Sequence, residues 1–189
     1  MYMRSLQSAW HEKWVWQHCS TSLELLRYTA SSVLETFPFP APSESLESVG
    51  HAYYVHRQQL IVSRKECLTA IYNKFHDPSV LSDDIGMLRS LQRELDSAIA
   101  AAYSWTDFDL EHGFHETKRG LRYTISEIAR RKVLDRLLAL NHQRHAEEEA
   151  AKIKTLAQPN PTTKHGRKVK TEVATRRIGS FDFEGAEHE

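Results

Sequence analysis

The stretch SDDIGMLRSLQRELDSAIAAAYSW, residues 82–105, decides the fold class, because its apolar residues recur every three or four positions. This spacing predicts an α-helix with one buried face. The predicted buried face comprises Ile85, Leu88, Leu91, Leu95, Ile99 and Ala102. Ser82 is a suitable N-cap, and Asp83 and Asp84 suit the positive end of the helix dipole. The face expected to meet solvent comprises Arg89, Gln92, Arg93, Glu94 and Asp96.

An upstream helix is predicted to begin after Ser43 or Ser45, since both are good N-caps. Its helical spacing continues to about His76, and Asp77-Pro78 ends it. A single long helix is therefore expected between the proline-rich segment and residue 77.

Downstream, FHETKRGLRYTI (114–125) predicts a β-hairpin with Gly120 at the turn. Thr124-Ile-Ser-Glu127 then has the pattern of a capping box, and a helix is expected from about residue 126 to 155. Its second half is polar on most faces. The predicted fold class is mainly α: a helical C-terminal domain with a small β element at the N-terminus and a β-hairpin before the last long helix.

The N-terminal segment, residues 1–42, is predicted to close at ETFPFPAP (35–42). Within it, WHEKWVWQHCS (10–20) partly alternates apolar and polar residues, which favours a strand over a helix. The prolines favour extended backbone, so Phe37 and Phe39 are expected to point to opposite sides and anchor the chain where it enters the helical domain, residues 43–155. A proline-rich loop with incidental aromatics is the alternative.

Composition sets the limits on class and compartment. The chain has 189 residues and a formal net charge of zero, so no global field draws it to nucleic acid or membrane. The two cysteines form no CxxC pattern, which fits a reducing compartment. No signal-like or membrane-spanning apolar run is present, so a cytoplasmic protein without a membrane partner is expected. The tail, residues 156–189, carries a basic block and then an acidic one, and disorder is expected there.

Motifs of common catalytic sites are missing from the sequence. It has no glycine-rich phosphate loop, no GxSxG elbow and no HExxH pair, and no cofactor or catalytic residue is predicted in this chain. Four histidines have paired spacing: His112, His115, His142 and His145. They could ligate a metal if the last helix folded back on the hairpin. Solvated histidines are the favoured interpretation, so no metal site is predicted.

Basic residues interleaved with aromatics are the candidate binding residues. Lys13 and Arg27 accompany the tryptophans and Tyr28 and are candidates for reading bases. The hairpin and the start of the last helix carry a second cationic cluster, suited to a DNA backbone. The full candidate DNA-binding set is Lys13, Arg27, Lys118, Arg119, Arg122, Arg130 and Arg131. Because acids are mixed in, an ordinary solvated face is the favoured alternative on composition alone.

Several stretches resemble a known enzyme group. RYTASSVLETFPFP (27–40) resembles the end of the target-recognition region in type IIG restriction–modification enzymes and MmeI-like adenine-specific DNA methyltransferases. The stretches 68–78, 88–110 and 113–148 are similar to the C-terminal helical region of the same enzymes. This chain departs from that group at Tyr103-Ser104-Trp105, where the group has Tyr-Gly-Trp, and Ser104 is expected to disfavour the left-handed turn that glycine allows.

The resemblance implies a non-catalytic DNA-recognition and helical support fragment of such a system, as a truncated or split gene product. S-adenosylmethionine binding and adenine methylation, sometimes with endonuclease activity, belong to the parent enzyme. DNA and a separately encoded methyltransferase subunit are the implied partners. The alternative is a stand-alone helical protein-interaction module. A DNA reader needs exposed Arg and Lys side chains, whereas an interaction module would bury Trp10, Trp14 and Trp16 or present them as an apolar patch.

Overall fold

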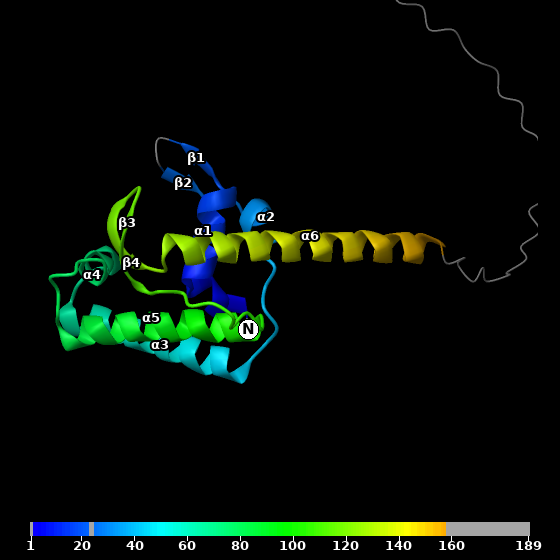
Figure 1. Ribbon diagram of the computed structural model, residues 1–189. Helices are drawn as coiled ribbons and strands as arrows, with labels where there is room; N and C mark the ends of the chain where they lie inside the picture. Colours follow the sequence, from blue (N-terminus) through cyan, green and yellow to red (C-terminus); the bar gives the residue numbers. More distant parts are fainter. Residues whose placement is uncertain (1, 23–24, 158–189) are drawn as a thin grey trace, which may run out of the picture.

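The computed structural model describes residues 2–22 and 25–157, and it confirms the mainly α fold class (Figure 1). The first half consists of a 3-10 helix η1 (Tyr2–Gln7), α1 (Ala9–His18), the strands β1 (Ser20–Ser22) and β2 (Leu25–Arg27), α2 (Ala30–Val33) and α3 (Glu44–Arg64). The second half consists of α4 (Leu68–Phe75), α5 (Asp83–Ala102), the strands β3 (Gly113–Thr117) and β4 (Gly120–Thr124), and α6 (Glu127–Ala157). The predicted tail lies almost entirely outside the described residues.

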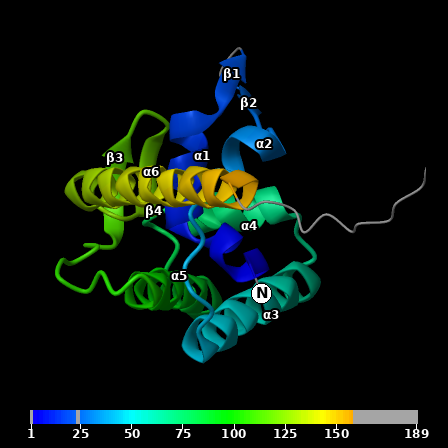
Figure 2. The ribbon, with the colours of Figure 1, turned by 90° about the vertical axis from the view of Figure 1, so that its right-hand side faces the viewer.

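Helices α3 and α5 lie side by side, and α1 packs between α5 and α6 (Figures 1 and 2). One core cluster contains residues from all these helices and from the Phe-Pro segment. The second half of α6 extends beyond this body, and its residues 145–155 are exposed (Figure 1). Of the described helices, none is long and apolar enough to cross a membrane.

The tryptophan segment is a helix, so the expected strand over residues 10–20 is wrong. The Ser8 hydroxyl accepts a hydrogen bond from the His11 amide at 3.3 Å and caps α1. Trp10 and Trp14 lie one helical turn apart, and both are buried. Burying this pair outweighs the alternation around Trp14 and Trp16, because the side-chain area removed from water is large. The small N-terminal β element follows it as an antiparallel pair of strands, β1 and β2.

The upstream helix begins after Ser43 as predicted, but it is broken in two. Lys65 adopts a left-handed backbone with φ 53° and ends α3. After the break, α4 redirects Ile71 and Phe75 into the core against α5. Arg64, at the end of α3, donates two hydrogen bonds of 2.7 Å to the carboxylate of Asp84, which fixes this end of α3 to the start of α5. The single helix expected up to residue 76 is therefore wrong.

Helix α5 has the predicted bounds and buried stripe, but Asp96 does not face solvent. This carboxylate is fully buried. One oxygen accepts a hydrogen bond from the Ala9 amide at 2.9 Å, and the other accepts from Gln92 Nε2 at 3.3 Å. The second oxygen also lies 2.9 Å from His112 Nε2, which is buried as well. Asp96 thus satisfies an amide in the first turn of α1, where the helix dipole favours a negative charge.

The Phe-Pro segment is anchored from two helices. Phe37 is buried and packs edge-on against Phe39, with ring centroids 5.0 Å apart. The two rings therefore contact one another instead of pointing to opposite sides. Tyr103 Oη donates to the carbonyl of Pro38 at 2.7 Å, and Asn141 Nδ2 donates to the carbonyl of Thr36 at 2.6 Å. The domain boundary at residue 42 stays a prediction, since residues on both sides contribute to one core.

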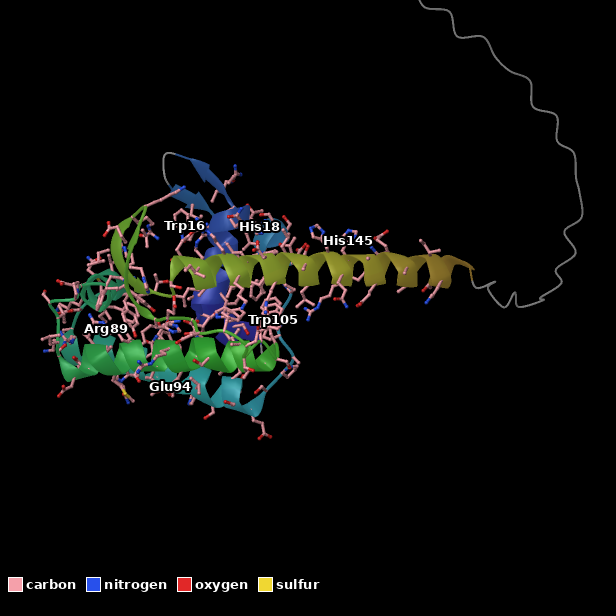
Figure 3. The ribbon with its side chains drawn as sticks, in the orientation of Figure 1. Trp16, His18, Arg89, Glu94, Trp105 and His145 are labelled. Atoms are coloured by element: carbon pink, nitrogen blue, oxygen red, sulfur yellow. The ribbon has the colours of Figure 1, made fainter. Side chains whose placement is uncertain are left out.

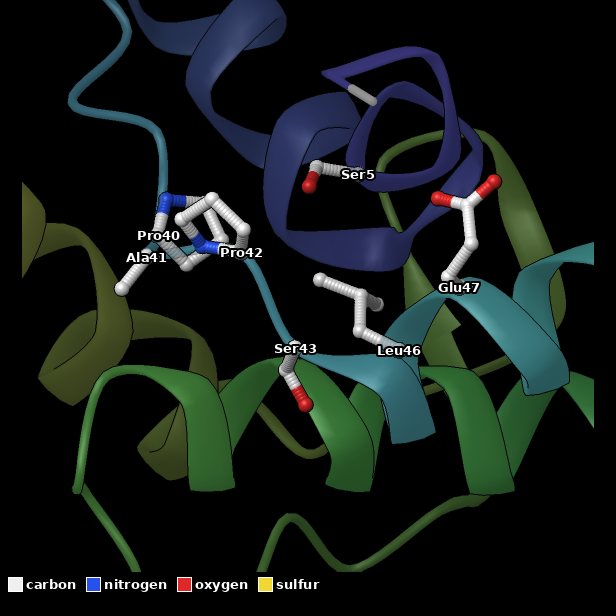
Figure 4. Close-up of a pocket in the computed structure, with 7 residues that line it drawn as sticks. All are labelled: Ser5, Pro40, Ala41, Pro42, Ser43, Leu46 and Glu47. Atoms are coloured by element: carbon white, nitrogen blue, oxygen red, sulfur yellow. The ribbon is translucent and has the colours of Figure 1, made fainter.

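A pocket beside this segment is too small for a ligand. It lies between η1 and the start of α3, lined by Ser5, Leu46 and residues 40–43 and 47 (Figure 4). Its volume of about 10 Å³ is only enough for a single water molecule.

The chain turns back after α5 through a left-handed residue. Ser104 has φ 61°, so the left-handed turn is present although serine stands where glycine was expected. The amide of Ser104 donates to the carbonyl of Ala101 at 2.9 Å, and the amide of Trp105 donates to that of Ala100 at 2.8 Å. This pair of bonds defines a Schellman motif, in which glycine is the usual left-handed residue.

The predicted hairpin before α6 is present. Strands β3 and β4 are antiparallel, joined at Lys118-Arg119, and Gly120 takes the left-handed conformation with φ 86°. The helix cap differs from the prediction: the buried hydroxyl of Ser126 accepts from the Ala129 amide at 3.1 Å. The capping box at Thr124 is therefore wrong, because Thr124 belongs to β4 and the cap lies two residues later.

Candidate nucleic-acid interface

An open groove of about 890 Å³ lies between α1, α4, the β3–β4 hairpin and the first turn of α6. Five of the seven candidate DNA-binding residues line it: Lys13, Lys118, Arg119, Arg122 and Arg130. They come from three elements, since Lys13 is on α1, Arg130 is on α6, and the others belong to the hairpin. The groove thus collects cations that lie more than a hundred residues apart in the sequence.

Two of these cations are already neutralised. Lys13 Nζ lies 3.3 Å from a carboxylate oxygen of Glu12, and Arg130 donates two hydrogen bonds of 2.6 Å to Glu127. Both carboxylates also line the groove, as does Glu116. The arginine beside Glu127 holds the pKa of that carboxyl down at about 2. These pairs contribute little net charge to the groove.

The other three cations belong to the hairpin: Lys118, Arg119 and Arg122. Among the described residues, none of the three forms an ion pair with a carboxylate. Lys118 and Arg119 are exposed at the turn, and Arg122 is half-buried on β4. Their positive charge is therefore available to an anion from outside the chain.

His76 is a half-buried imidazole in the groove wall, close to several of the cations. Its Nδ1 accepts a hydrogen bond of 3.2 Å from the amide of Tyr123, which fixes the proton of the neutral ring on Nε2. The pKa of His76 falls from an ordinary value of 6.5 to about 4, mainly because of burial and next because of the charge of Arg122. Arg119 and Lys13 lower the same pKa, whereas Glu12 opposes them. His76 is therefore neutral near pH 7 and adds a hydrogen-bond donor instead of a charge.

Trp16 is the aromatic residue on the α1 wall. About 36% of its surface is exposed, whereas Trp10 and Trp14 are buried. The guanidinium of Arg119 lies over its ring, 4.9 Å from the centroid. Figure 3 places Trp16 on the side of α1 that faces the β3–β4 hairpin. The groove therefore combines free cations with an accessible aromatic surface.

Arg89 connects the α4 wall of the groove to the hairpin wall. Its guanidinium donates to four backbone carbonyls, those of Lys74, Phe75, Asp77 and Val80. The same guanidinium lies 5.0 Å from the ring centroid of Phe114 on β3 and 5.8 Å from that of Tyr123 on β4. The sequence placed Arg89 on a solvent face, but the side chain satisfies carbonyls at the end of α4 and supports the hairpin. Its position beside α4 is visible in Figure 3.

Two candidate residues lie outside the groove. Arg27 is exposed on β2, and Arg131 is exposed on α6, where it donates to Glu127 at 2.9 Å. Conversely, α4 and its C-cap residue supply the wall residues Thr69, Asn73 and His76, which the sequence did not single out. No local pattern could identify them, because their position depends on the break between α3 and α4.

The four histidines considered as metal ligands do not come together. His112 contacts Asp96, the Nε2 atom of His115 is 2.8 Å from the carbonyl of Glu111, and His142 and His145 lie on the exposed part of α6. Within residues 2–22 and 25–157, no cluster of three metal-binding side chains is found.

Comparison with known proteins gives no match to a protein-family model, a curated protein or a solved structure. The groove is therefore interpreted from its own residues. Its free cations suit phosphate groups, and the tryptophan ring suits a planar apolar surface.

Proposed function

We propose that this chain binds DNA through the groove, as the recognition and support part of a restriction–modification or adenine-specific DNA methyltransferase system. The observation that carries the proposal is the set of three hairpin cations that pair with no carboxylate in the described part of the chain, next to the exposed ring of Trp16. The sequence resemblance supplies the class of system. Methyl transfer from S-adenosylmethionine is assigned to the parent enzyme or to a separately encoded subunit, and no catalytic role is assigned to this chain.

The expected affinity is modest. The whole chain has no net charge, so attraction arises only at the groove. Non-specific binding of this electrostatic kind has a Kd of roughly 10⁻⁴–10⁻⁶ M at physiological salt. Each neutralised phosphate contributes about −0.9 to the slope of log K against log salt for a duplex, so three contacts give a slope of about −2.7.

A fluorescence-anisotropy titration tests the proposal. Mixed-sequence DNA, labelled at one end, is offered as a duplex and as separated strands at roughly 50 mM salt, where the electrostatic contribution is strong. The double variant Lys118→Glu/Arg119→Glu should weaken binding and flatten the salt slope. The matched control Lys152→Glu/Lys154→Glu changes the net charge equally, at the far end of α6, and should bind like the parent chain.

Arg27 and Arg131 are tested separately, because they lie outside the groove. Arg131→Glu should have less effect than Arg119→Glu if the groove is the binding site. Arg27→Gln should matter only if one sequence is preferred over others, as expected of a base-reading side chain. Equal losses for Arg131→Glu and Arg119→Glu would move the interface to the outer face of α6.

The protein-interaction module remains the second candidate, because Trp10 and Trp14 are buried in the core as that interpretation expects. The exposed Arg27 and Arg119 and the partly exposed Trp16 favour the DNA reader. The same titration separates the two candidates. If neither form of DNA binds at roughly 50 mM salt, where electrostatic attraction is strong, the interaction module is favoured.

A further inference from the structure

We propose that the groove takes an unpaired stretch of the bound DNA, with one base stacked on Trp16, in preference to an intact duplex. This inference rests on the proposed function and deepens it by naming the form of the DNA that the site recognises.

The first argument is the exposure of Trp16. The two other tryptophans of α1, Trp10 and Trp14, are 0% and 1% exposed and belong to the hydrophobic core. Trp16 keeps 36% of its surface open, and Arg119 lies over its ring. An exposed indole that already stacks with a guanidinium can stack with a planar, electron-rich ring in its place.

The second argument is the concave shape. The groove is open, and its volume of about 890 Å³ lies within the range of about 300–1,000 Å³ that is typical of small-molecule sites. In a duplex, each base has both faces stacked on its neighbours, so a ring in the wall of a groove cannot stack on one. An unpaired strand presents its base faces, which aromatic side chains can then cover.

The third argument is the division of chemistry between the two walls. The hairpin wall carries Glu116 and the three cations that form no ion pair within residues 2–22 and 25–157, and these cations suit the phosphates on either side of a nucleotide. The α4 wall carries uncharged hydrogen-bonding groups: Thr69, Asn73 and the neutral ring of His76. Gln17 adds an amide from α1. Amides and a neutral imidazole suit the edge of a base better than a phosphate.

The experiment compares a labelled 12-nucleotide single strand with the duplex of the same sequence by fluorescence anisotropy at roughly 50 mM salt. The wild-type chain should bind the single strand more tightly. Trp16→Ala should weaken single-strand binding by roughly 5- to 150-fold, the effect of losing one stacked base, and should weaken duplex binding far less. Trp16→Phe keeps a stackable ring and should recover most of the lost affinity.

Two controls define the outcome. Tyr54→Ala removes a partly exposed aromatic ring on α3, outside the groove, and should change neither affinity. Lys118→Glu should weaken both forms. A duplex that binds as tightly as the single strand, or a Trp16→Ala variant that binds both forms like the parent, would overturn the inference and leave DNA binding in place. Absence of binding to either form by the wild-type chain would overturn the proposed function itself.

Discussion

Replacing Ser104 with glycine should stabilise the protein. Ser104 is the left-handed residue of the Schellman motif that ends α5, with φ 61°. The motif itself is fully formed, since the amides of Ser104 and Trp105 donate to the carbonyls of Ala101 and Ala100 at 2.9 and 2.8 Å. The turn therefore keeps its hydrogen bonds in the variant, and only the conformational cost of the residue changes.

The size of the gain follows from two opposing effects. A side chain in the left-handed region costs about 1–2 kcal/mol, because its Cβ approaches the following carbonyl oxygen. Glycine avoids that cost but has more freedom in the unfolded chain, which costs about 0.4–1 kcal/mol. The net gain is about 0.5–1 kcal/mol, and Tm should rise by about 1–4 °C for a chain of this size.

Thermal and urea unfolding of Ser104→Gly measure this gain, with Ser97→Gly as the control. Ser97 lies on the exposed face of α5, where the same substitution should lower stability by about 0.5 kcal/mol through helix propensity. Both variants replace a serine with glycine, and they differ only in the backbone conformation of the residue that is replaced. If Ser104→Gly lowers stability as much as Ser97→Gly does, residue 104 is not left-handed and the turn has been misassigned.

Three further predictions concern stability. Asp96→Ala removes the acceptor of a buried amide and of a buried histidine, so it should lower the free energy of unfolding in urea by about 3–5 kcal/mol. A decrease below about 1 kcal/mol would contradict the buried hydrogen-bond network. Phe37→Ala should cost about 3–5 kcal/mol because the ring is 3% exposed, and unfolding like the parent would show that the Phe-Pro segment is only a loop. Burial lowers the pKa of His11 and His76 to about 4, so the unfolded chain binds more protons than the folded chain between pH 6.5 and 4. Tm should therefore be steady above pH 6.5 and fall from pH 6.5 to about 5, and it should fall less steeply in His76→Asn. A Tm that does not change from pH 6.5 to about 5 would contradict the low pKa values.

Helix α5 could be predicted because its apolar spacing and start signal are local. Helix α1 could not be predicted, because the spacing of its tryptophans fits both a strand and a helix. Which of the two forms depends on residues far along the chain that pack against the tryptophans. The ring of Trp10 stacks on Tyr103 and Trp105, with centroids 5.6 and 5.9 Å away. Likewise, no glycine, proline or asparagine marks the break at Lys65, so the left-handed residue there gives no local signal.

The candidate interface was predictable for Lys13 and for the cations of the hairpin and α6, but not for the α4 wall. Lys118, Arg119, Arg122 and Arg130 come together because a tight hairpin leads directly into α6, so their proximity is a short-range property of the chain. The opposite wall required α4 to turn away from α3 and carry His76 to the hairpin. The prediction that Asp96 faces solvent was wrong for a related reason. An acidic residue is predicted to face solvent unless its buried hydrogen-bond donors are known, and those of Asp96 lie on α1 and at His112.

The contacts of α1 imply that the chain would reassemble after being cut. A nick in the exposed stretch at residues 41–42 would leave a short piece carrying Trp10 and the donor amide of Ala9, and a long piece carrying Asp96 and the aromatic rings that receive Trp10. Each piece alone would expose apolar surface and a polar group that had been satisfied in the core. The short piece should therefore act as a tight peptide ligand of the long one, so the two would form a split protein whose halves complement each other.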